Sequence, residues 1–451
     1  MANFAKSQVP RFSVDVYQNE FLPEGGREVS AIVTVTATGG GTSGGAPLSG
    51  VSASPSGVPF PTASAAVVIM VDCSGSMDYP PQKMRNARDA TAAAIETLRD
   101  GTEFAVVAGT HTARQIYPES GGLAVADAST RAEARNALRK LSAGGGTAIG
   151  TWLRLADELF AGARARIRHG ILLTDGRNEH ESPAELHGAL ETVAARFTCD
   201  ARGVGTDWEV KEVTGIASAL LGTADIVADP AHLAADFTAM MESAMGKEVA
   251  DVSLRLWTPV GVEIVFVKQV APTVEDITAR RTEAGPRAGD YPTGSWGDES
   301  RDYHICVRVP EAGIGQEMLA ARASLIVPAT GGTPEVLSQG LVRAVWTDDL
   351  ASSTAISPQV AHYTGQAELA QVIQQGLDAR KSGDIDGATA KLGRAVQLAE
   401  ASGNADTAKL LSKVVDVVDA ATGTVRLKAK VADADEMTLE TRSTKTVRVK
   451  K

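Results

Sequence analysis

The sequence predicts an α/β domain inserted into a β-sandwich and followed by a small α-helical domain. Strand-like and helical patterns alternate over residues 65–248, strand-like patterns alone fill residues 249–350, and Ala-, Leu- and Gln-rich helical spacing returns over residues 359–422. Alternation of this kind is typical of a doubly wound, mostly parallel sheet with helices on both faces. A length of 451 residues, at roughly 150 per domain, also favours about three domains.

The segment before the α/β domain has two parts that differ sharply in composition. Residues 12–37 alternate apolar and polar side chains, which predicts two strands. An isolated strand pair is marginal in water, so we expect residues 1–37 to complete the later sandwich. Residues 38–64 contain seven Gly, four Pro and six Ser, which predicts a flexible linker. Its GxGxxG and GxSxG matches are ordinary products of low complexity.

The elements of the α/β domain follow from apolar periodicity and from the capping residues. Strands are predicted at residues 65–72, 104–110, 113–118, 169–176, 199–206 and 224–229. Helices are predicted at residues 81–98, 129–141 (with Ser129 as the cap), 148–162, 183–197, 209–221 and 231–245.

The remainder of the chain divides into strands, helices and a basic segment. Sandwich strands are predicted at residues 252–259, 262–270, 302–310, 318–328 and 337–347. Three helices are predicted over residues 359–422; the pattern resembles one tetratricopeptide-like hairpin, but a plain helical bundle fits it better. Residues 423–451 are a basic, Thr-rich tail that we expect to be extended or disordered in isolation.

Composition excludes several classes of function. A net charge of −11 argues against nonspecific nucleic-acid binding, and 4% aromatic residues argue against base-stacking surfaces. The amino terminus lacks an apolar signal core, and the longest apolar run, residues 65–71, is too short to span a membrane. Three scattered cysteines (Cys73, Cys199 and Cys306) match neither a disulfide framework nor a CxxC metal site. We therefore expect a reduced, cytoplasmic protein.

Polar side chains at the end of the first α/β strand form a candidate metal site. Asp72, Ser74 and Ser76 make a D-x-S-x-S pattern there. In an open α/β sheet, the loops at the carboxyl ends of the strands form the binding crevice. Thr147 in GGGTAIG and Asp175 in LLTDG supply a further hydroxyl and carboxylate at the corresponding loops. Oxygen ligands of this kind suit a hard divalent cation.

The segments DCSGSM, GGGTAIG and LLTDG resemble the metal-ion-dependent adhesion site of von Willebrand factor type A (VWA) domains. The resemblance covers about residues 65–247, in the right order, and extends to cytoplasmic VWA proteins of actinobacteria. It implies a VWA, Rossmann-like fold. It also implies Mg²⁺, with Mn²⁺ or Ca²⁺ as alternatives, held directly by Ser74, Ser76 and Thr147. Asp72 and Asp175 would act largely through water, leaving one coordination position for an Asp or Glu of a partner protein.

These residues and their neighbours also have other interpretations. Ser and Asp also cap helices, so the D-x-S-x-S pattern alone could be an N-cap cluster. Cys73 is expected to be buried packing, because the sequence places no His beside it. His180, Glu181 and His187 do not form HExxH and fit a solvated helix start better. Asp78 and Tyr79, beside the metal loop, could equally contact a partner or be ordinary surface.

The basic tail also has two interpretations. It could be a solvated terminus. It could alternatively be a phosphorylated segment that binds a phosphopeptide-binding partner such as a forkhead-associated domain, as the resemblance to actinobacterial proteins suggests. The candidate threonines are Thr438, Thr441, Thr444 and Thr446.

These observations favour a protein that is not an enzyme, namely a metal-dependent protein–protein interaction module. The alternative is a VWA subunit of a Mg²⁺-dependent AAA+ or chelatase-like assembly; the chain itself has no GxxxxGK phosphate loop. A free-standing hydrolase fits least, because hydroxyl ligands are unusual for activating water and the loop segments contain no His or Glu as a base.

Overall fold

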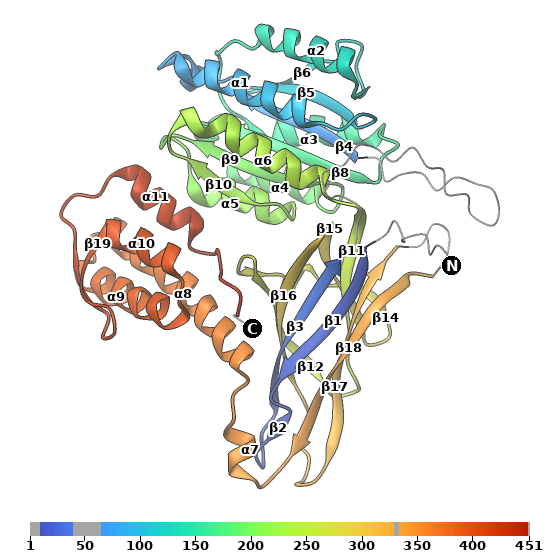
Figure 1. Cartoon of the computed structure of the whole chain (residues 1–451), viewed down its shortest axis with the longest axis vertical. Helices are drawn as coiled ribbons and strands as arrows, with labels where there is room; N and C mark the ends of the chain where they lie inside the picture. The colour runs from blue at the N-terminus through green and yellow to red at the C-terminus, as the bar shows by residue number, and fades with distance from the viewer. Residues whose placement is uncertain (1–9, 39–64, 329–332, 450–451) are drawn as a thin grey trace, which may run out of the picture. The chain divides into compact units, whose positions relative to one another are not determined.

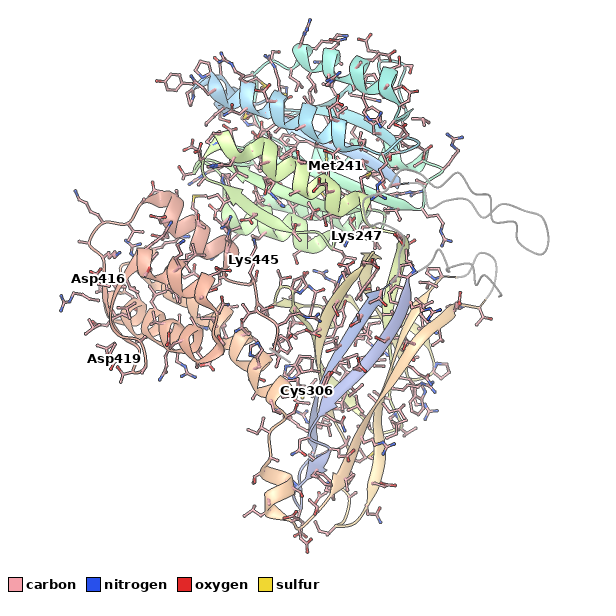
Figure 2. All side chains as sticks on the ribbon, viewed as in Figure 1. Met241, Lys247, Cys306, Asp416, Asp419 and Lys445 are labelled. Carbon is pink, nitrogen blue, oxygen red and sulfur yellow. The ribbon has the colours of Figure 1, made fainter. Side chains whose placement is uncertain are left out.

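The computed structural model describes residues 10–38, 65–328 and 333–449, and they form two compact units (Figure 1; side chains are drawn in Figure 2). Among the described residues, the first unit contains residues 65–250 and 294–297, and the second contains the rest. The linker predicted at residues 38–64, with the GxGxxG and GxSxG matches inside it, lies outside the described residues, apart from residue 38. In the described parts, no helix combines the length and the apolar character needed to cross a membrane.

The first unit is built on a mostly parallel sheet with the strand order β10-β9-β8-β4-β5-β6 and with β7 also paired to β5. Its parallel strands are near-continuous apolar runs, as expected for strands that are covered on both faces. They are β4 (Ala65–Asp72), β5 (Glu103–Gly109), β8 (Ile167–Thr174), β9 (Thr198–Val204) and β10 (Ala224–Val227). The antiparallel edge is formed by β6 (Ala113–Tyr117) and β7 (Ala124–Val125).

Helices cover the sheet and end close to where the sequence predicted. They are α1 (Gln82–Thr97), α2 (Ala128–Ala137), α3 (Ile149–Ala161), α4 (Pro183–Val193), α5 (Val210–Ala219) and α6 (Leu233–Met245). Short 3₁₀ turns are η1 (Gly75–Asp78), η2 (Leu138–Lys140) and η3 (Pro230–His232). One prediction is wrong: the cap of α2 is Asp127, in a reciprocal capping box with Thr130, rather than Ser129.

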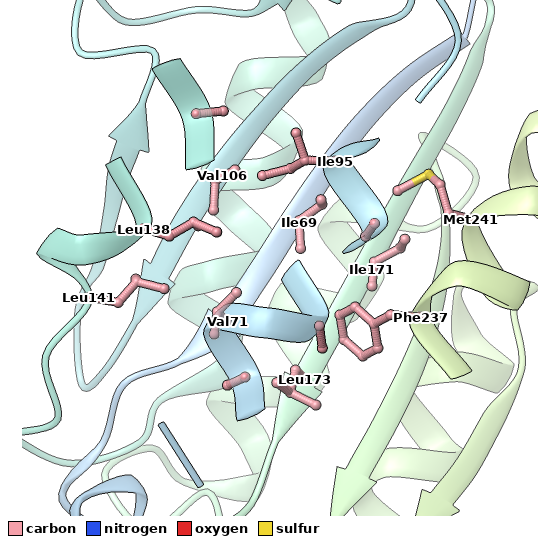
Figure 3. Packing of buried hydrophobic residues seen from close by; sticks show 14 of the residues in the cluster. Ile69, Val71, Ile95, Val106, Leu138, Leu141, Ile171, Leu173, Phe237 and Met241 are labelled. Atoms are coloured by element: carbon pink, nitrogen blue, oxygen red, sulfur yellow. The ribbon is translucent and has the colours of Figure 1, made fainter. Parts of the chain in front are cut away.

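Alternate residues of the central strands form the core beneath α1 and α6. Figure 3 shows Ile69 and Val71 of β4 and Ile171 of β8 packed with Phe237 and Met241 of α6. All five side chains are fully buried. The doubly wound fold predicted from the strand–helix alternation is therefore confirmed, with β4 in the middle of the sheet.

Two glycines of this sheet leave room for buried tryptophan rings. A Cβ atom on Gly109 of β5 would lie 2.3 Å from the ring of Trp152, and one on Gly203 of β9 would lie 2.0 Å from the ring of Trp208. The two indole N–H groups donate to backbone carbonyls at 2.7 and 3.0 Å. Non-bonded carbon atoms do not approach to such distances, so both positions require glycine as long as the rings stay where they are.

The second unit contains the two sheets of the predicted sandwich. The five-stranded sheet has the order β1-β3-β16-β12-β13, and the six-stranded sheet has the order β14-β15-β11-β17-β18-β2. The amino-terminal strands β1 (Arg11–Gln18) and β3 (Glu28–Thr38) lie in the first of these sheets, where β3 pairs antiparallel with β16 (Glu299–Arg308). The first unit is thus an insertion between β3 and β11 (Val249–Trp257), whose first two residues it includes.

The other sandwich strands include several that the sequence did not indicate. The predicted ones are β12 (Glu263–Ala271), β17 (Glu317–Val327) and β18 (Glu335–Trp346). The additional ones are β2 (Phe21–Leu22), β13 (Glu275–Asp276), β14 (Thr282–Gly285) and β15 (Ala288–Trp296), with the 3₁₀ turn η4 (Thr278–Arg280) between β13 and β14.

The carboxyl-terminal region is helical, and the basic tail is part of it. After α7 (Leu350–Thr354), the three predicted helices are α8 (Pro358–Lys381), α9 (Ile385–Ser402) and α10 (Ala405–Val414). The hairpin of β19 (Val415–Asp419) and β20 (Thr424–Leu427) and the helix α11 (Asp433–Arg442) follow. Leu439 of α11 is 0% exposed and packs in one cluster with α8, α9 and α10.

In the intact chain, residues 424–449 contain the strand β20 and the helix α11, whereas the expectation for the isolated segment stays a prediction. Thr438 and Thr441 donate their hydroxyls to helix carbonyls at 2.5 and 2.7 Å. Thr446 donates to the Val270 carbonyl at 2.7 Å, and Lys445 (Figure 2) forms a β-bridge with Thr273. Three of the four candidate phosphorylation threonines, Thr438, Thr441 and Thr446, thus donate their hydroxyls to backbone carbonyls.

A buried carboxylate joins the sandwich to the carboxyl-terminal region within the second unit. Asp302 of β16 is 2% exposed. It accepts hydrogen bonds from the Thr34 hydroxyl at 2.6 Å and the Tyr363 hydroxyl at 2.5 Å. Arg448 adds two more, from Nε at 3.0 Å and Nη2 at 2.8 Å. One side chain therefore links β3, β16, α8 and the end of the chain.

The sandwich also contains a histidine that should make its stability depend on pH. Burial, followed by the charge of Lys268, lowers the pKa of His304 from 6.5 to about 4. The unfolded chain then binds the proton first, so stability is complete above pH 6.5 and falls as the pH drops towards 4. We expect a loss of about 2 kcal/mol between pH 7.5 and pH 5 from this group.

Replacement of His304 by phenylalanine should remove that loss, because the variant has no proton to bind. The change in the free energy of unfolding is measured by urea titration at both pH values, with hydrogen exchange of peptides that cover β16 as the signal. The matched control is His187→Phe on α4, where the side chain is 73% exposed. An equal pH dependence in the wild type and in His304→Phe would contradict the prediction.

Candidate metal site

The site begins at the buried carboxyl end of β4. Asp72 is 0% exposed. One of its oxygens accepts the Ser74 backbone N–H at 2.8 Å, and the other accepts the Thr174 hydroxyl at 2.7 Å. Burial raises the pKa of Asp72 to about 6, although these hydrogen bonds act to lower it. Thr174 was missed in the sequence, where its only signal is its place directly before Asp175 at the end of a buried strand.

The two serines connect this loop to β8. Their hydroxyl oxygens lie 2.9 Å apart, and the Ser76 hydroxyl donates to Oδ1 of Asp175 at 2.7 Å. Ser74 is the first flanking residue of η1, yet its side chain makes no capping hydrogen bond, and α1 begins after Pro81. The interpretation of D-x-S-x-S as a helix cap is therefore wrong, and the hydroxyls point to each other and to Asp175 instead.

The Gly-rich loop brings Thr147 to the same place. The N–H of Gly75 donates to the Gly145 carbonyl at 2.9 Å, and the N–H of Gly144 donates to the Cys73 carbonyl at 2.8 Å, so the two loops are tied together. A Cβ atom on Gly176 would lie 3.0 Å from the Ser76 hydroxyl oxygen and 3.9 Å from that of Thr147. Both hydroxyls therefore face the space beside Gly176.

Residues after β8 fix the position of the Thr147 loop. His180 and Thr147 exchange hydrogen bonds: the His180 N–H donates to the Thr147 carbonyl at 3.0 Å, and the Thr147 N–H donates to Nδ1 of His180 at 3.4 Å. Asn178 and Glu181 accept the N–H groups of Ile149 and Gly150, both at 2.8 Å, which caps α3. The predicted solvated helix start is wrong for Glu181, because its side chain is only 4% exposed.

A lysine lies beside the acidic side of the site. Nζ of Lys83, in the first turn of α1, donates to Oδ2 of Asp175 at 2.7 Å and lies 3.4 Å from Oδ2 of Asp207. Its side chain is 11% exposed. Burial alone would lower the pKa of Lys83, but the hydrogen bonds and charges of Asp175 and Asp207 outweigh burial and raise it. The local sequence pattern around Lys83 does not indicate this role.

Cys73 is packing, as predicted. It is 2% exposed, and burial together with the charge of Asp72 raises the pKa of its thiol to about 12, which disfavours the reactive thiolate. Tyr79, in contrast, is 83% exposed next to the loop.

The donors collected here suit a hard divalent cation. Three hydroxyls and two carboxylates converge, all of them oxygen ligands of the kind Mg²⁺ and Ca²⁺ take. Within residues 10–38, 65–328 and 333–449, no three His, Cys, Asp or Glu side chains gather in a metal-binding cluster. A site dominated by Cys and His, as for structural zinc, is therefore not what these residues form.

Comparison with known proteins places this domain in a family. Residues 65–226 match the model of the von Willebrand factor type A domain. A solved structure described as von Willebrand factor type A, from Catenulispora acidiphila, is 51% identical, covers 99% of this chain and 99% of its own, and has a TM-score of 0.90. The chain belongs to the VWA family.

Further comparisons extend the similarity beyond the VWA domain itself. Residues 397–443 match the model of the von Willebrand factor type A C-terminal domain; the match runs from the end of α9 through α11 and crosses the predicted boundary at residue 423. An uncharacterized protein of Synechocystis is 28% identical over 345 residues, 73% of this VWA chain and 77% of its own length.

One more solved structure shares the fold at low identity. The ArnB paralog VWA2 from Sulfolobus acidocaldarius is 14% identical with a TM-score of 0.55, and the match covers 95% of this chain and 97% of that one. The fold of this chain is therefore also found in a protein of very different sequence.

Proposed function

We propose that this VWA protein is a noncatalytic interaction module that binds an Asp or Glu carboxylate of a partner protein through Mg²⁺. The observation that supports it is the convergence of the Ser74, Ser76 and Thr147 hydroxyls with Asp72 and Asp175 at one end of the sheet. When bound, the metal supplies a positive centre that an external carboxylate can ligate.

Charge counting favours a carboxylate as the incoming ligand. The three hydroxyl ligands are neutral, and the resemblance implies that Asp72 and Asp175 act largely through water. Much of the charge of a divalent cation would therefore stay uncompensated by its direct ligands. The incoming carboxylate therefore gains electrostatic energy from the metal in a site whose carboxylates are 0% exposed and poorly screened.

The surroundings of the site support binding rather than catalysis. The sequence placed no base near the loops, but the fold brings His180 beside Thr147. Its Nδ1 accepts the Thr147 N–H, so this nitrogen is occupied in holding the loop. Three buried, unpaired cysteines also support a reduced location, and we include the cytoplasm in this proposal.

Two measurements test the proposal in sequence. Calorimetric titration with Mg²⁺ alone should show binding to the wild type, and Thr147→Ala should weaken it roughly tenfold or more, since even outer-shell changes cost that much. Capture of partners from extract of the native organism should then require Mg²⁺, fail in EDTA and fail with Thr147→Ala. The matched control is Thr192→Ala on α4, whose hydroxyl bonds only the Gly188 carbonyl among the described contacts.

The outcomes separate the competing functions. Capture that is indifferent to EDTA and to Thr147→Ala would overturn the proposal. Magnesium-dependent recovery of an ATPase would support a VWA subunit of an AAA+ assembly instead. Hydrolysis of an ester or phosphate by the purified protein, lost in Thr147→Ala, would show that the protein is an enzyme.

A further inference from the structure

The position of Lys83 is not explained by the helix that carries it. It is the second residue of α1, and the first turn of that helix contains no acidic side chain. The amino-terminal end of a helix carries partial positive charge, so a lysine there is unfavourable for the helix itself. The side chain is nevertheless 11% exposed and turned towards Asp175. The contacts at its end must offset both the burial and the helix dipole.

Those contacts occupy the oxygens that a metal would use. Oδ1 of Asp175 accepts the Ser76 hydroxyl, and Oδ2 accepts the Lys83 ammonium, both at 2.7 Å. The ammonium also lies 3.4 Å from the Ser76 carbonyl oxygen. A divalent cation that approaches Asp175, directly or through water, meets a positive charge already at hydrogen-bonding distance from the same carboxylate. Two cations this close repel each other strongly in a buried site.

A second acceptor gives the ammonium somewhere to go. Oδ2 of Asp207, on the loop after β9, is 3.4 Å from Nζ of Lys83, and the side chain of Asp207 is 71% exposed. Lysine has a flexible four-carbon stem and three donors, so its end can move between acceptors without a change in the backbone. Transfer towards Asp207 would free Asp175 while keeping the ammonium paired.

We propose that Lys83 is a tethered cation that competes with the metal: it pairs with Asp175 when the metal is absent and moves to Asp207 when the metal binds. This inference rests on the proposed metal site. It makes Lys83 a positioning residue that sets the affinity for the metal, with Asp207 as its second acceptor. Weak metal affinity would then be a property of the chain itself, and ligation by a partner's carboxylate would help to hold the metal in place.

Metal affinity in four proteins tests this: the wild type, Lys83→Met, Asp207→Asn and the double variant. Titration with Mg²⁺, and with Mn²⁺ followed by electron paramagnetic resonance, gives the dissociation constants. We expect Lys83→Met to bind about tenfold more tightly than the wild type, and Asp207→Asn about threefold more weakly. In the Lys83→Met background, Asp207→Asn should have a clearly smaller effect, because the ammonium it would receive is gone.

The controls separate competition from general charge and from misfolding. Arg85→Met removes one positive charge from the same helix at an exposed position and should leave the affinity unchanged. Lys83→Gln repeats the test should the Met variant fail to fold. If the wild type binds metal but neither Lys83 variant binds it more tightly, this inference is overturned and the proposed metal site is not. Absence of metal binding in all four proteins overturns the proposed metal site and this inference with it.

Discussion

Replacement of Asp302 by alanine should lower the free energy of unfolding of the second unit by about 3 kcal/mol. The substitution removes the acceptor of four hydrogen bonds, two of them from a guanidinium. The Tyr363 hydroxyl is the costly one, because this residue is 2% exposed and would be left without its acceptor in the interior. Arg448 is 43% exposed and can turn to water.

That asymmetry gives the measurement its control. Arg448→Ala should cost only about 1 kcal/mol, since Asp302 keeps its two hydroxyl donors and the lost pair is half exposed. Asp416→Ala, in the β19–β20 hairpin (Figure 2), should change little, because its side chain is 63% exposed. Urea unfolding followed by hydrogen exchange in β3, β16 and α8 compares all three. Equal losses for Asp302→Ala and Asp416→Ala would contradict the prediction.

The second large effect is expected at Gly203. An alanine there would place its Cβ 2.0 Å from the ring of Trp208, which is only 2% exposed. The strand cannot retreat, because β9 pairs with β8 on one side and β10 on the other. Overpacking of this kind costs about 1–3 kcal/mol and occasionally more. We expect Gly203→Ala to lower the free energy of unfolding of the first unit by about 3 kcal/mol.

A double-variant cycle shows whether the ring is the cause. Trp208→Leu alone removes the obstacle, at its own cost, and Gly203→Ala added to it should then cost less than about 1 kcal/mol. Gly188→Ala on α4 is the matched control: its Cβ meets nothing within 4 Å, and alanine favours a helix interior. Equal costs for Gly203→Ala with and without Trp208 would contradict this explanation.

The sequence predicted the α/β fold well because its signals are local. The buried parallel strands are mostly apolar, and Asp72 ends one of them while Asp175 directly follows another, so their meeting at one edge follows from topology. The strand β15 was missed because its sequence, AGDYPTGSW, contains three residues that weaken strand patterns, Gly289, Pro292 and Gly294. Its pairing within a larger sheet outweighs that weak propensity.

The folded state of the tail in the intact chain was not predicted, because its charges were counted within the segment alone. Residues 424–451 contain eight Lys or Arg and four Asp or Glu, but three of those acids pair with bases from earlier helices. Glu436 pairs with Arg380, Glu440 with Lys381 at 2.7 Å, and Asp435 with Lys413 at 2.6 Å. These ion-pair partners lie 22 to 59 residues away in sequence, so the composition of the tail alone cannot predict the pairs.

The supports of the metal site were missed for a related reason. His180, Glu181 and Lys83 act on Thr147, Gly150 and Asp175 across the sheet edge, and nothing in their local spacing indicates those partners.

The insertion of the first unit between β3 and β11 has a consequence for synthesis on the ribosome. Thr34 of β3 pairs with Asp302 of β16, and 268 residues separate them. At about 5–20 residues per second, β3 waits roughly 15–50 s before its neighbour is made. During that time its apolar residues Ile32, Val33 and Val35, all 0% exposed in the finished protein, have only the β1 hairpin beside them. The inserted VWA domain can fold in that interval, so β1 and β3 are translated before this domain but complete their sheet only after it.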